Sequence, residues 1–279
     1  MIYHRDMEIL LTNDDGYDSE GLASLERAFI AAGHGVTVVA PDQERSACSH
    51  SITLFTPLFV QERRTGGRER PVYAVNGTPT DCCKLALNEI VADRKPDLVV
   101  SGINLGANLG ANIFYSGTIG GAFEGVLAGI PAIAISVEGQ SSEHVDEIAR
   151  LAVNLVEKLV VGVTGDLCRE RLLMYNINFP DCHPTLIKGV RVAPHGRSAF
   201  ADDYEMRIDP RQRAYYWLSG VQGYVYPPGR SSTPDDDLGV VSSGHVAITP
   251  LKFDLNCPEE LDRLAGLDFE LAEGPRDPG

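Results

Sequence analysis

Two adjacent carboxylates, Asp14 and Asp15, are the first residues of the chain whose types and spacing suggest chemistry. They follow the apolar segment 7–11 after two intervening residues, and Gly16 after them allows the chain to turn sharply. Carboxylate oxygens presented by such a turn are typical ligands of a hard divalent cation such as magnesium, manganese or calcium. The alternative is an Asx turn that caps the following helix, and these three residues alone leave both interpretations open.

A second polar segment, residues 42–51, follows the apolar segment 36–40 and carries the hydroxyl of Ser46. A serine hydroxyl at this position could complete a metal shell or donate a hydrogen bond to phosphate. Serines in a surface loop are more often only solvated, so this segment alone is a weak signal. His50 could protonate a leaving oxygen, although an isolated loop histidine more often has no catalytic role.

The most informative segment is the Gly- and Asn-rich stretch 101–118, whose backbone must closely approach another group. At its end, Ser116, Gly117 and Thr118 open a helix. The free amides, the dipole and the hydroxyls at that helix start predict a phosphate site, to which Asn108 is a further candidate contributor. Ordinary helix capping explains the same residues, and capping can coexist with phosphate binding.

Common nucleotide and hydrolase motifs are missing from the sequence. It contains no G-x-x-x-x-G-K-[ST] segment, no G-x-G-x-x-G after the first apolar segment, and no G-x-S-x-G elbow. The sequence therefore disfavours a kinase-like ATPase, a dinucleotide oxidoreductase and a serine hydrolase.

Composition narrows the ligand class further. The 279 residues include 24 Lys and Arg against 39 Asp and Glu, a net charge of −15, which argues against a nucleic-acid polymer as the ligand. A small phosphorylated ligand remains compatible, because backbone amides and one metal ion can supply positive potential locally. The 6 cysteines form no C-x-x-C pair, and no apolar stretch is long enough for a membrane span. We therefore expect reduced thiols, a cytoplasmic location and no membrane partner.

Apolar runs of about five residues alternate with helical patterns through the first two thirds of the chain. This alternation predicts an α/β fold with a parallel sheet that helices cover on both faces. The sequence predicts strands at 7–11, 36–40, 97–101, 132–136, 172–177 and 245–250, and helices near 21–32, 81–92, 120–129, 143–160 and 258–265. Residues 52–61 and 72–75 suggest either a β-hairpin or an exposed excursion. Ligands of such sheets bind outside the carboxyl ends of the strands, where all three polar segments would meet.

The alternation of apolar runs and helical patterns ends at about residue 184. We expect a catalytic core at 1–184 and a smaller, hairpin-rich lobe at 185–279 that returns the strand 245–250 to the core. Tyrosines and a tryptophan cluster at 204–226 among charged residues, glycines and prolines, which suits an oligomer interface. A packed β-subdomain explains the same cluster equally well.

Five segments together resemble the survival protein SurE family of metal-dependent 5'-nucleotidases. They are ILLTNDDG (9–16), VVAPDQERSACSHSIT (38–53), VNGTPTDC (75–82), PDLVVSGINLGANLG (96–110) and YSGTIGGAFEG (115–125). The resemblance implies a Rossmann-like core, one divalent metal ion per subunit and a homodimer or homotetramer. It maps the metal ligands onto Asp14, Asp15, Ser46 and Asn104. It also implies hydrolysis of nucleoside 5'-monophosphates, and in some members of 3'-monophosphates or short polyphosphate.

The resulting hypothesis is a phosphomonoesterase in which Mg²⁺ or Mn²⁺ acts as Lewis acid and template, with Ca²⁺ able to occupy the site. The residues expected to hold the phosphate are Asn104, Asn108, Ser116, Gly117 and Thr118. A water attacks phosphorus with Asp14 or Asp15 as base, whereas direct attack by a carboxylate is the less favoured variant. The alternative from another class is a protein that binds a nucleoside monophosphate without hydrolysing it. A metal-using glycosyltransferase is disfavoured because a separated D-x-D is missing.

Overall fold

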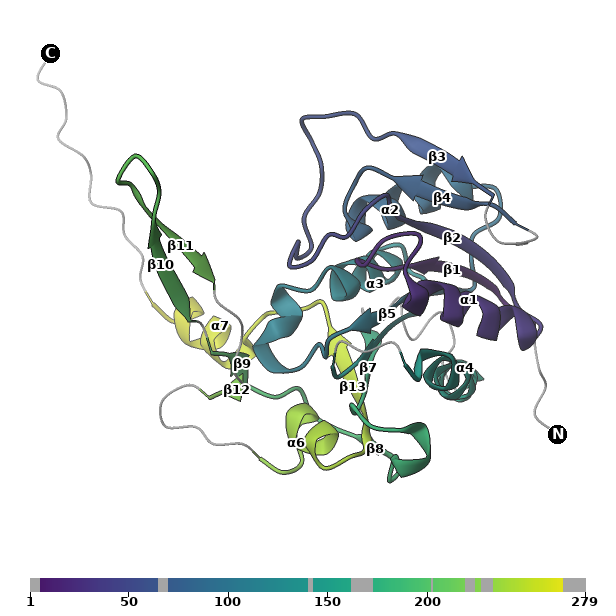
Figure 1. Ribbon diagram of the computed structural model, residues 1–279. Helices are drawn as coiled ribbons and strands as arrows, with labels where there is room; N and C mark the ends of the chain where they lie inside the picture. Colours follow the sequence, from purple (N-terminus) through teal and green to yellow (C-terminus); the bar gives the residue numbers. More distant parts are fainter. Residues whose placement is uncertain are drawn as a thin grey trace, which may run out of the picture.

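A nine-stranded sheet forms the centre of the molecule (Figure 1). The computed structural model describes residues 6–64, 70–139, 143–161, 173–201, 203–218, 224–226 and 233–267. The strands of the sheet are β1 (Glu8–Thr12), β2 (Gly35–Pro41), β3 (Val60–Arg63), β4 (Val72–Val75), β5 (Leu98–Leu105), β6 (Ala132–Val137), β7 (Leu173–Phe179), β8 (Val190–Val192) and β13 (Val246–Lys252). Their order is β3-β4-β2-β1-β5-β6-β7-β13-β8.

Most neighbouring strands of this sheet run parallel. Strand β1 pairs in parallel with β2 and β5, and the parallel pairing continues through β6 to β7. Antiparallel pairing joins β3 to β4 and β13 to β7. Strand β6 is buried along its whole length, as expected for a strand covered on both faces. The predicted α/β class is confirmed.

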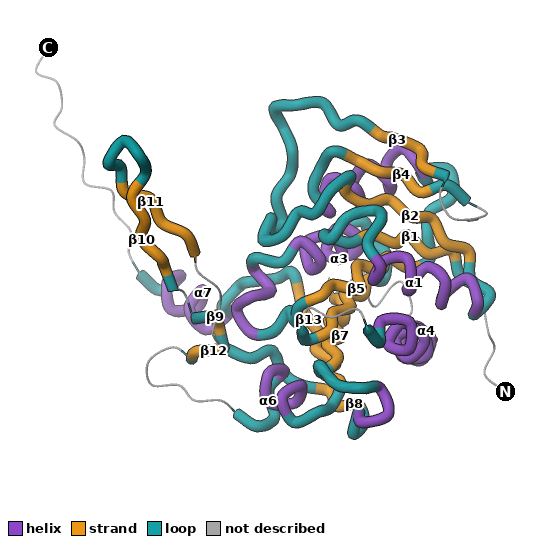
Figure 2. The backbone as a smooth tube through the Cα atoms, viewed as in Figure 1, coloured by secondary structure: helices purple, strands orange, loops and turns teal. Residues whose placement is uncertain are grey.

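The main helices cover the two faces of the sheet, whereas the helix of residues 258–265 lies away from the sheet, near the hairpin of residues 204–218 (Figure 2). The helical segments are α1 (Glu20–Ala31), α2 (Pro79–Leu85) with a π-helical continuation (Ala86–Ile90), α3 (Gly117–Leu127), α4 (Val145–Val161), α6 (Asp237–Ser242), α7 (Pro258–Ala265) and the 3₁₀ turns η2 (Gly110–Phe114) and η3 (Pro184–Leu186). Helices α1 and α4 pack on one face and α2 and α3 on the other. None of the helices in the described ranges is long and apolar enough to cross a membrane.

Alternate residues of each central strand supply the two cores. Ile9 and Leu11 of β1 pack with Phe29 of α1, whereas Leu10 between them packs with Ala122 of α3. This distribution follows from the two-residue side-chain period of a strand. It explains why β1 reads as a continuous apolar run ending at the candidate site.

Helix caps follow the local sequence. Thr78 caps α2 and forms a reciprocal capping box with Asp81, with Pro79 in the first turn. Ser116 caps α3 by accepting a hydrogen bond from Ile119 N at 3.1 Å. These caps fix where α2 and α3 begin relative to the sheet edge.

Of the two alternatives for 52–61, the hairpin holds only at its end, because only Val60–Arg63 pairs with β4, and the residues before it form a mostly exposed excursion. The preceding segment is held by side chains instead of a ladder. Asn76 accepts from Phe59 N at 2.6 Å, and Asp81 accepts from both the amide and the hydroxyl of Thr53 at 2.9 and 2.6 Å. Pro57 in this segment also lacks the amide that a ladder requires.

The region after residue 184 contains short strands and a projecting hairpin. Strand β10 (Tyr204–Ile208) pairs antiparallel with β11 (Ala214–Leu218), and β9 (Ala199–Phe200) pairs with β12 (Tyr224–Val225). The hairpin β10–β11 extends away from the sheet (Figure 1). Strand β8 joins the sheet in addition to the expected strand β13, so two strands of this region complete it. The C-terminal tail from 268 lies outside the described residues.

Candidate functional site

Three neighbouring strands bring the polar segments of the sequence together. Strand β1 lies between β2 and β5 and is parallel to both, so the segments that follow them leave the same edge of the sheet. Backbone hydrogen bonds join the segments: Arg45 N donates to Asp14 O at 2.7 Å, and Ser49 N donates to Tyr115 O at 2.9 Å. The predicted convergence at the carboxyl edge is therefore present.

Asp14 lies against the start of α3. Its Oδ1 accepts a hydrogen bond from the Thr118 hydroxyl at 2.5 Å, and only 5% of the residue is exposed. A Cβ on Gly117 would lie 2.9 Å from Cβ and 3.1 Å from Oδ2 of Asp14, so this approach requires glycine. Burial raises the pKa of Asp14, and hydrogen bonds from Thr118 and from the backbone at residues 117 and 118 partly oppose this shift.

Asp15 is less buried than Asp14, and two other carboxylates lie near it. Burial raises its pKa to about 7, with further contributions from the charges of Asp14 and Glu44, while a backbone hydrogen bond from Leu105 opposes the shift. Its Oδ2 atom is buried and has no hydrogen-bond partner among the described residues. Such an orphaned carboxylate oxygen suits a cation ligand.

Ser46 lies in the segment that follows β2, and Asn104 lies at the end of β5. The Ser46 hydroxyl donates to Glu44 Oε1 at 2.5 Å, and Asn104 Nδ2 donates to Gly106 O at 2.6 Å. The latter bond fixes the amide of Asn104 and leaves its carbonyl oxygen for another donor or a cation. Asn104 belongs to the end of β5, not to the loop as predicted, because β5 continues to Leu105 through a register shift opposite β6.

The predicted phosphate residues already make protein contacts. Ser116 caps α3, and Thr118 donates to Asp14. Asn108 N donates to Asn178 Oδ1, and Asn108 Nδ2 donates to Ser136 Oγ, both at 2.8 Å. The structure thus gives Asn108 a fixed position beside the ends of β6 and β7.

Some polar residues near the site were not singled out in the sequence. Asn176 and Asn178 of β7 both donate side-chain hydrogen bonds to Asn108 O, at 2.8 and 3.1 Å. Two asparagines in the otherwise apolar strand LMYNINF were the available signal. Glu44 was also missed, although it stands in the same segment as Ser46.

His50 is not brought to the carboxylate pair. Its Nε2 lies 2.7 Å from Glu124 Oε1, and its ring packs against Phe123 and Phe253. Lys84 Nζ lies 3.2 Å from the other oxygen of Glu124. These contacts give His50 a structural explanation and provide no support for a general acid.

Comparison with known proteins identifies the family. The sequence model described as Survival protein SurE matches residues 9–202. The chain belongs to the SurE family. It is 43% identical over 263 residues to the protein named 5'-nucleotidase SurE of Nitratidesulfovibrio vulgaris strain DP4, covering 94% of this chain and 100% of that protein. It is 40% identical over 271 residues to the protein of the same name from Nostoc sp. strain PCC 7120, covering 95% of this chain and 100% of that protein.

The fold agrees with this assignment. The crystal structure of the SurE protein from Aquifex aeolicus aligns with a TM-score of 0.75 at 36% identity, covering 92% of this chain and 98% of that one. The predicted family resemblance is therefore confirmed over nearly the whole chain.

The donor set of this SurE chain fits a hard divalent cation. Within the described ranges, no cluster of three or more His, Cys, Asp or Glu side chains is arranged to hold a metal ion. A metal at the sheet edge would therefore be held by two carboxylates together with neutral oxygens, which is a set suited to Mg²⁺ or Mn²⁺ and not to zinc. The free Oδ2 of Asp15 is the structural observation that favours it.

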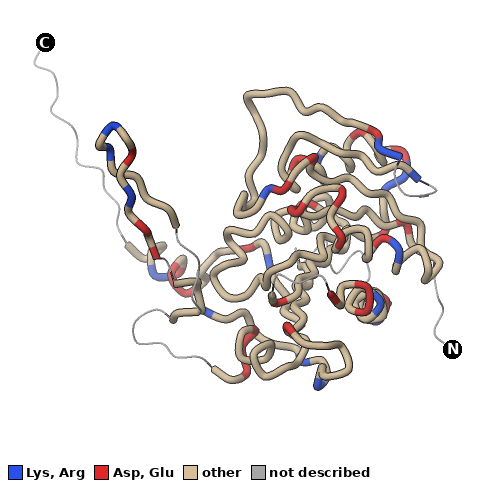
Figure 3. Tube along the Cα trace, viewed as in Figure 1, with Lys and Arg blue, Asp and Glu red and all other residues tan. Residues whose placement is uncertain are grey.

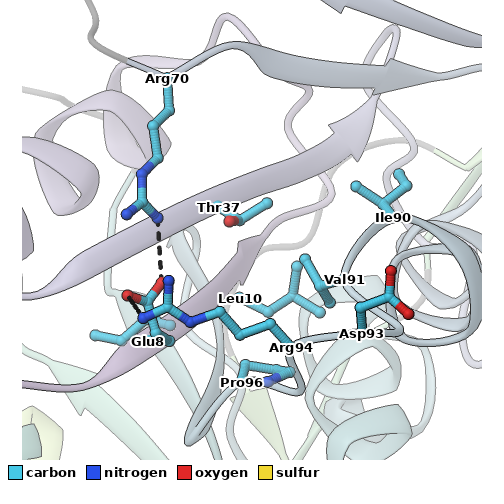
Figure 4. A pocket seen from close by; sticks show the side chains of 10 residues that line it. Glu8, Leu10, Thr37, Arg70, Ile90, Val91, Asp93, Arg94 and Pro96 are labelled. Carbon is cyan, nitrogen blue, oxygen red and sulfur yellow. Dashed lines mark hydrogen bonds and ion pairs between the residues drawn. The ribbon is translucent and has the colours of Figure 1, made fainter.

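A separate hollow lies where β1 begins, at the opposite edge of the sheet (Figure 4). Glu8 projects into it between two guanidinium groups, 3.1 Å from Arg70 Nη1 and 2.7 Å from Arg94 Nη2. The glutamate offsets their charge, and Asp93 adds another acid to the lining. Basic residues are scattered along the trace and interspersed with acidic ones (Figure 3).

Proposed function

We propose that this chain is a divalent-metal-dependent 5'-nucleotidase that hydrolyses nucleoside monophosphates to nucleoside and phosphate. The observation that carries the proposal is Asp14 lying against the first turn of α3, with the unpartnered Oδ2 of Asp15 next to it in the chain. Carboxylates for a cation and a helix start for an anion meet at one point. The names of the relatives from Nitratidesulfovibrio vulgaris and Nostoc support the same activity.

The proposed ligands of one metal ion per subunit are Asp14, Asp15, Ser46 and Asn104, with Mg²⁺ or Mn²⁺ as the native ion. Calcium has the same preference for oxygen ligands and could occupy the site. When bound, the ion supplies Lewis-acid polarisation of a phosphate oxygen and a template for the substrate.

The chain's own groups then orient the reaction. Asn104 and Asn108, together with Ser116, Gly117 and Thr118 at the start of α3, contact the remaining phosphate oxygens. A water attacks phosphorus in line, a carboxylate accepts its proton, and the nucleoside oxygen leaves and takes up a proton from solvent. Asp15 is the better-placed proton acceptor, because Asp14 Oδ1 already accepts the Thr118 hydroxyl.

The direct test is phosphate release from a panel containing nucleoside 5'-monophosphates, 3'-monophosphates and short polyphosphate. We expect release with Mg²⁺ or Mn²⁺ and none after EDTA treatment. Binding of a nucleoside monophosphate without phosphate release in either metal would favour the non-hydrolytic alternative. Release that persists in EDTA would contradict metal dependence.

We also propose that the subunit forms a homodimer or homotetramer through the hairpin β10–β11. Residues directly opposite each other in an antiparallel pair share a face. One face of the hairpin therefore carries only apolar and aromatic side chains, all exposed: Tyr204, Met206, Ile208, Tyr216 and Leu218, beside Ala214. An isolated two-stranded hairpin is marginal in water, so burial of this face against another subunit would stabilise it.

A further inference from the structure

We propose that Asp237 is a positioning residue for the candidate site, because it holds Gly110 in the middle of the segment that links β5 to α3. The inference rests on the proposed phosphatase function. Asp237 belongs to α6 in the C-terminal region, 127 positions from Gly110 in the sequence. Its side chain is fully buried, although a carboxylate is costly to bury without partners.

Three backbone amides from three different segments satisfy this carboxylate. Oδ2 accepts from Gly110 N at 2.9 Å, and Oδ1 accepts from Gly196 N at 3.0 Å and Leu238 N at 2.8 Å. One side chain therefore connects the candidate site's linking segment, the strand-free segment after β8, and the start of α6. Asp237 thus links segments that are distant in the sequence, which a helix cap at the surface does not do.

The carbonyl of Gly110 is held from the same region. His195 Nε2 lies 2.7 Å from Gly110 O, a hydrogen bond that requires the proton on Nε2. Both backbone polar groups of Gly110 thus have partners beyond residue 184. A side chain cannot replace this glycine, because its φ is +52° and an added Cβ would lie 2.2 Å from Ser198 O.

The two residues after Gly110 are also hydrogen-bonded to the C-terminal region. Ala111 N donates to Ser198 O at 2.6 Å, and Phe200 N donates to Asn112 Oδ1 at 3.2 Å. The start of η2 is therefore fixed against the segment 195–200, next to α6.

Gly110 is placed where its position matters for chemistry. It lies 6 residues after Asn104 and 6 residues before Ser116 in the sequence, and 2 residues after Asn108. Asn108 is anchored from the other side by β6 and β7. Gly110 lies between Asn108 and the start of α3. If Gly110 moves, both can shift relative to Asp14. A displacement of about 1 Å in such a site costs on the order of a hundredfold in rate.

The decisive variant is Asp237→Asn, which keeps the volume but replaces one acceptor oxygen with a donor. In either orientation, its NH₂ group faces a backbone N–H, from Gly110 or from Gly196 and Leu238. The matched control is Asp236→Ala, which removes the α6 cap, a 2.8 Å acceptor for Gly239 N, without contacting Gly110. Asp236 is also buried and lies on the same helix start.

We expect Asp237→Asn to lower kcat about tenfold or more at saturating Mn²⁺ and substrate, while Asp236→Ala stays within about twofold of wild type. Amide hydrogen exchange should accelerate in a peptide covering 106–116 in Asp237→Asn only. Equal exchange and equal kcat in the two variants would overturn the inference.

A second pair of variants covers the case in which Asp237→Asn does not fold. His195→Gln retains a donor for Gly110 O and should keep kcat, whereas His195→Ala should lower it. Equal kcat in these two variants would show that holding Gly110 does not affect turnover and would overturn the inference. If wild type releases no phosphate from any substrate, the proposed function fails, and the exchange experiment still decides whether Asp237 holds Gly110.

Discussion

The hydroxyl of Thr118 donates a 2.5 Å hydrogen bond to Oδ1 of Asp14, joining the first turn of α3 to the end of β1 across 104 positions of sequence. Thr118 was predicted to contact phosphate and Asp14 to bind a metal. Their contact couples the two halves of the proposed site, because any shift of α3 is transmitted to the carboxylate.

Removing this hydroxyl while keeping the side-chain shape tests that coupling. Thr118→Val leaves a buried Asp14 oxygen without its donor, at a cost of about 1–3 kcal/mol in the free energy of unfolding. We expect kcat to fall about tenfold or more, because Asp14 is then free to rotate. Thr118→Ser retains a hydroxyl and should preserve most of the activity. Wild-type kcat in Thr118→Val, measured as phosphate release, would contradict the coupling.

Asp14 and Asp15 should both be required for metal-dependent turnover. Asp14→Asn and Asp15→Asn each remove one anionic ligand, and we expect roughly a hundredfold or greater loss of metal-dependent turnover. The Mn²⁺-induced rise in Tm should disappear in both variants. Asp93→Asn, on the hollow at the other edge of the sheet, serves as the control. Near-normal turnover in either site variant would remove that residue from the proposed ligand set.

Proton and metal binding should compete at Asp15. Its pKa is raised from 3.8 to about 7 in the folded, metal-free chain, mainly by burial. Between these values the folded chain holds a proton that the unfolded chain has lost, so the free energy of unfolding decreases as pH rises through this window. A divalent cation removes that penalty only after displacing the proton. We therefore expect a larger Mn²⁺-induced rise in Tm at about pH 8 than at about pH 5.5.

A control variant makes the pH experiment specific to Asp15. Asp15→Asn should show no pH-dependent difference in the Mn²⁺-induced shift. The measurement is thermal unfolding at equal Mn²⁺ concentration and ionic strength. Equal shifts for wild type at both pH values would contradict competition at this carboxylate.

The alternation of strands and helices could be predicted because burial on both faces forces short, continuous apolar runs, as in β1 and β6. The edge of the sheet at which the segments carrying Asp14, Ser46 and Asn104 lie followed from the same rule. The sequence could not decide between a hairpin and an exposed excursion before β3, because Asn76 and Asp81 bind that backbone through their side chains, and strand patterns do not reveal such contacts.

Contacts between segments that are distant in the sequence could not be predicted from local sequence patterns. Nothing in the residues around Asp237 indicates that it accepts a hydrogen bond from Gly110, because that contact depends on how the C-terminal region folds back. Likewise, Asn176 and Asn178 acquire a role only because β7 ends beside Asn108. The sequence supplies the residue types, and the chain topology decides their partners.

Gly117 should tolerate no side chain. An alanine Cβ there would lie 2.7 Å from Cys48 Sγ and 2.9 Å from Asp14 Cβ, so Asp14 or the start of α3 must move. We expect Gly117→Ala to cost about 1–3 kcal/mol in the free energy of unfolding and most of the turnover. Gly266→Ala is the control, because its added Cβ meets no heavy atom closer than 3.6 Å. A fully active Gly117→Ala enzyme would contradict the close approach of Asp14 to α3.

The hairpin offers a matched pair of neighbouring tyrosines on opposite faces. Tyr216 lies opposite Met206 on the apolar face, whereas Tyr215 lies opposite Arg207 on the other face. Tyr216→Glu places a charge on the surface proposed to contact another subunit and should lower the molar mass measured by light scattering. Tyr215→Glu adds the same charge beside Arg207 and should leave the mass unchanged. The proposed interface predicts this difference, because a buried unpaired charge is far costlier than a solvated one. Identical masses for both variants and wild type would place the subunit interface elsewhere.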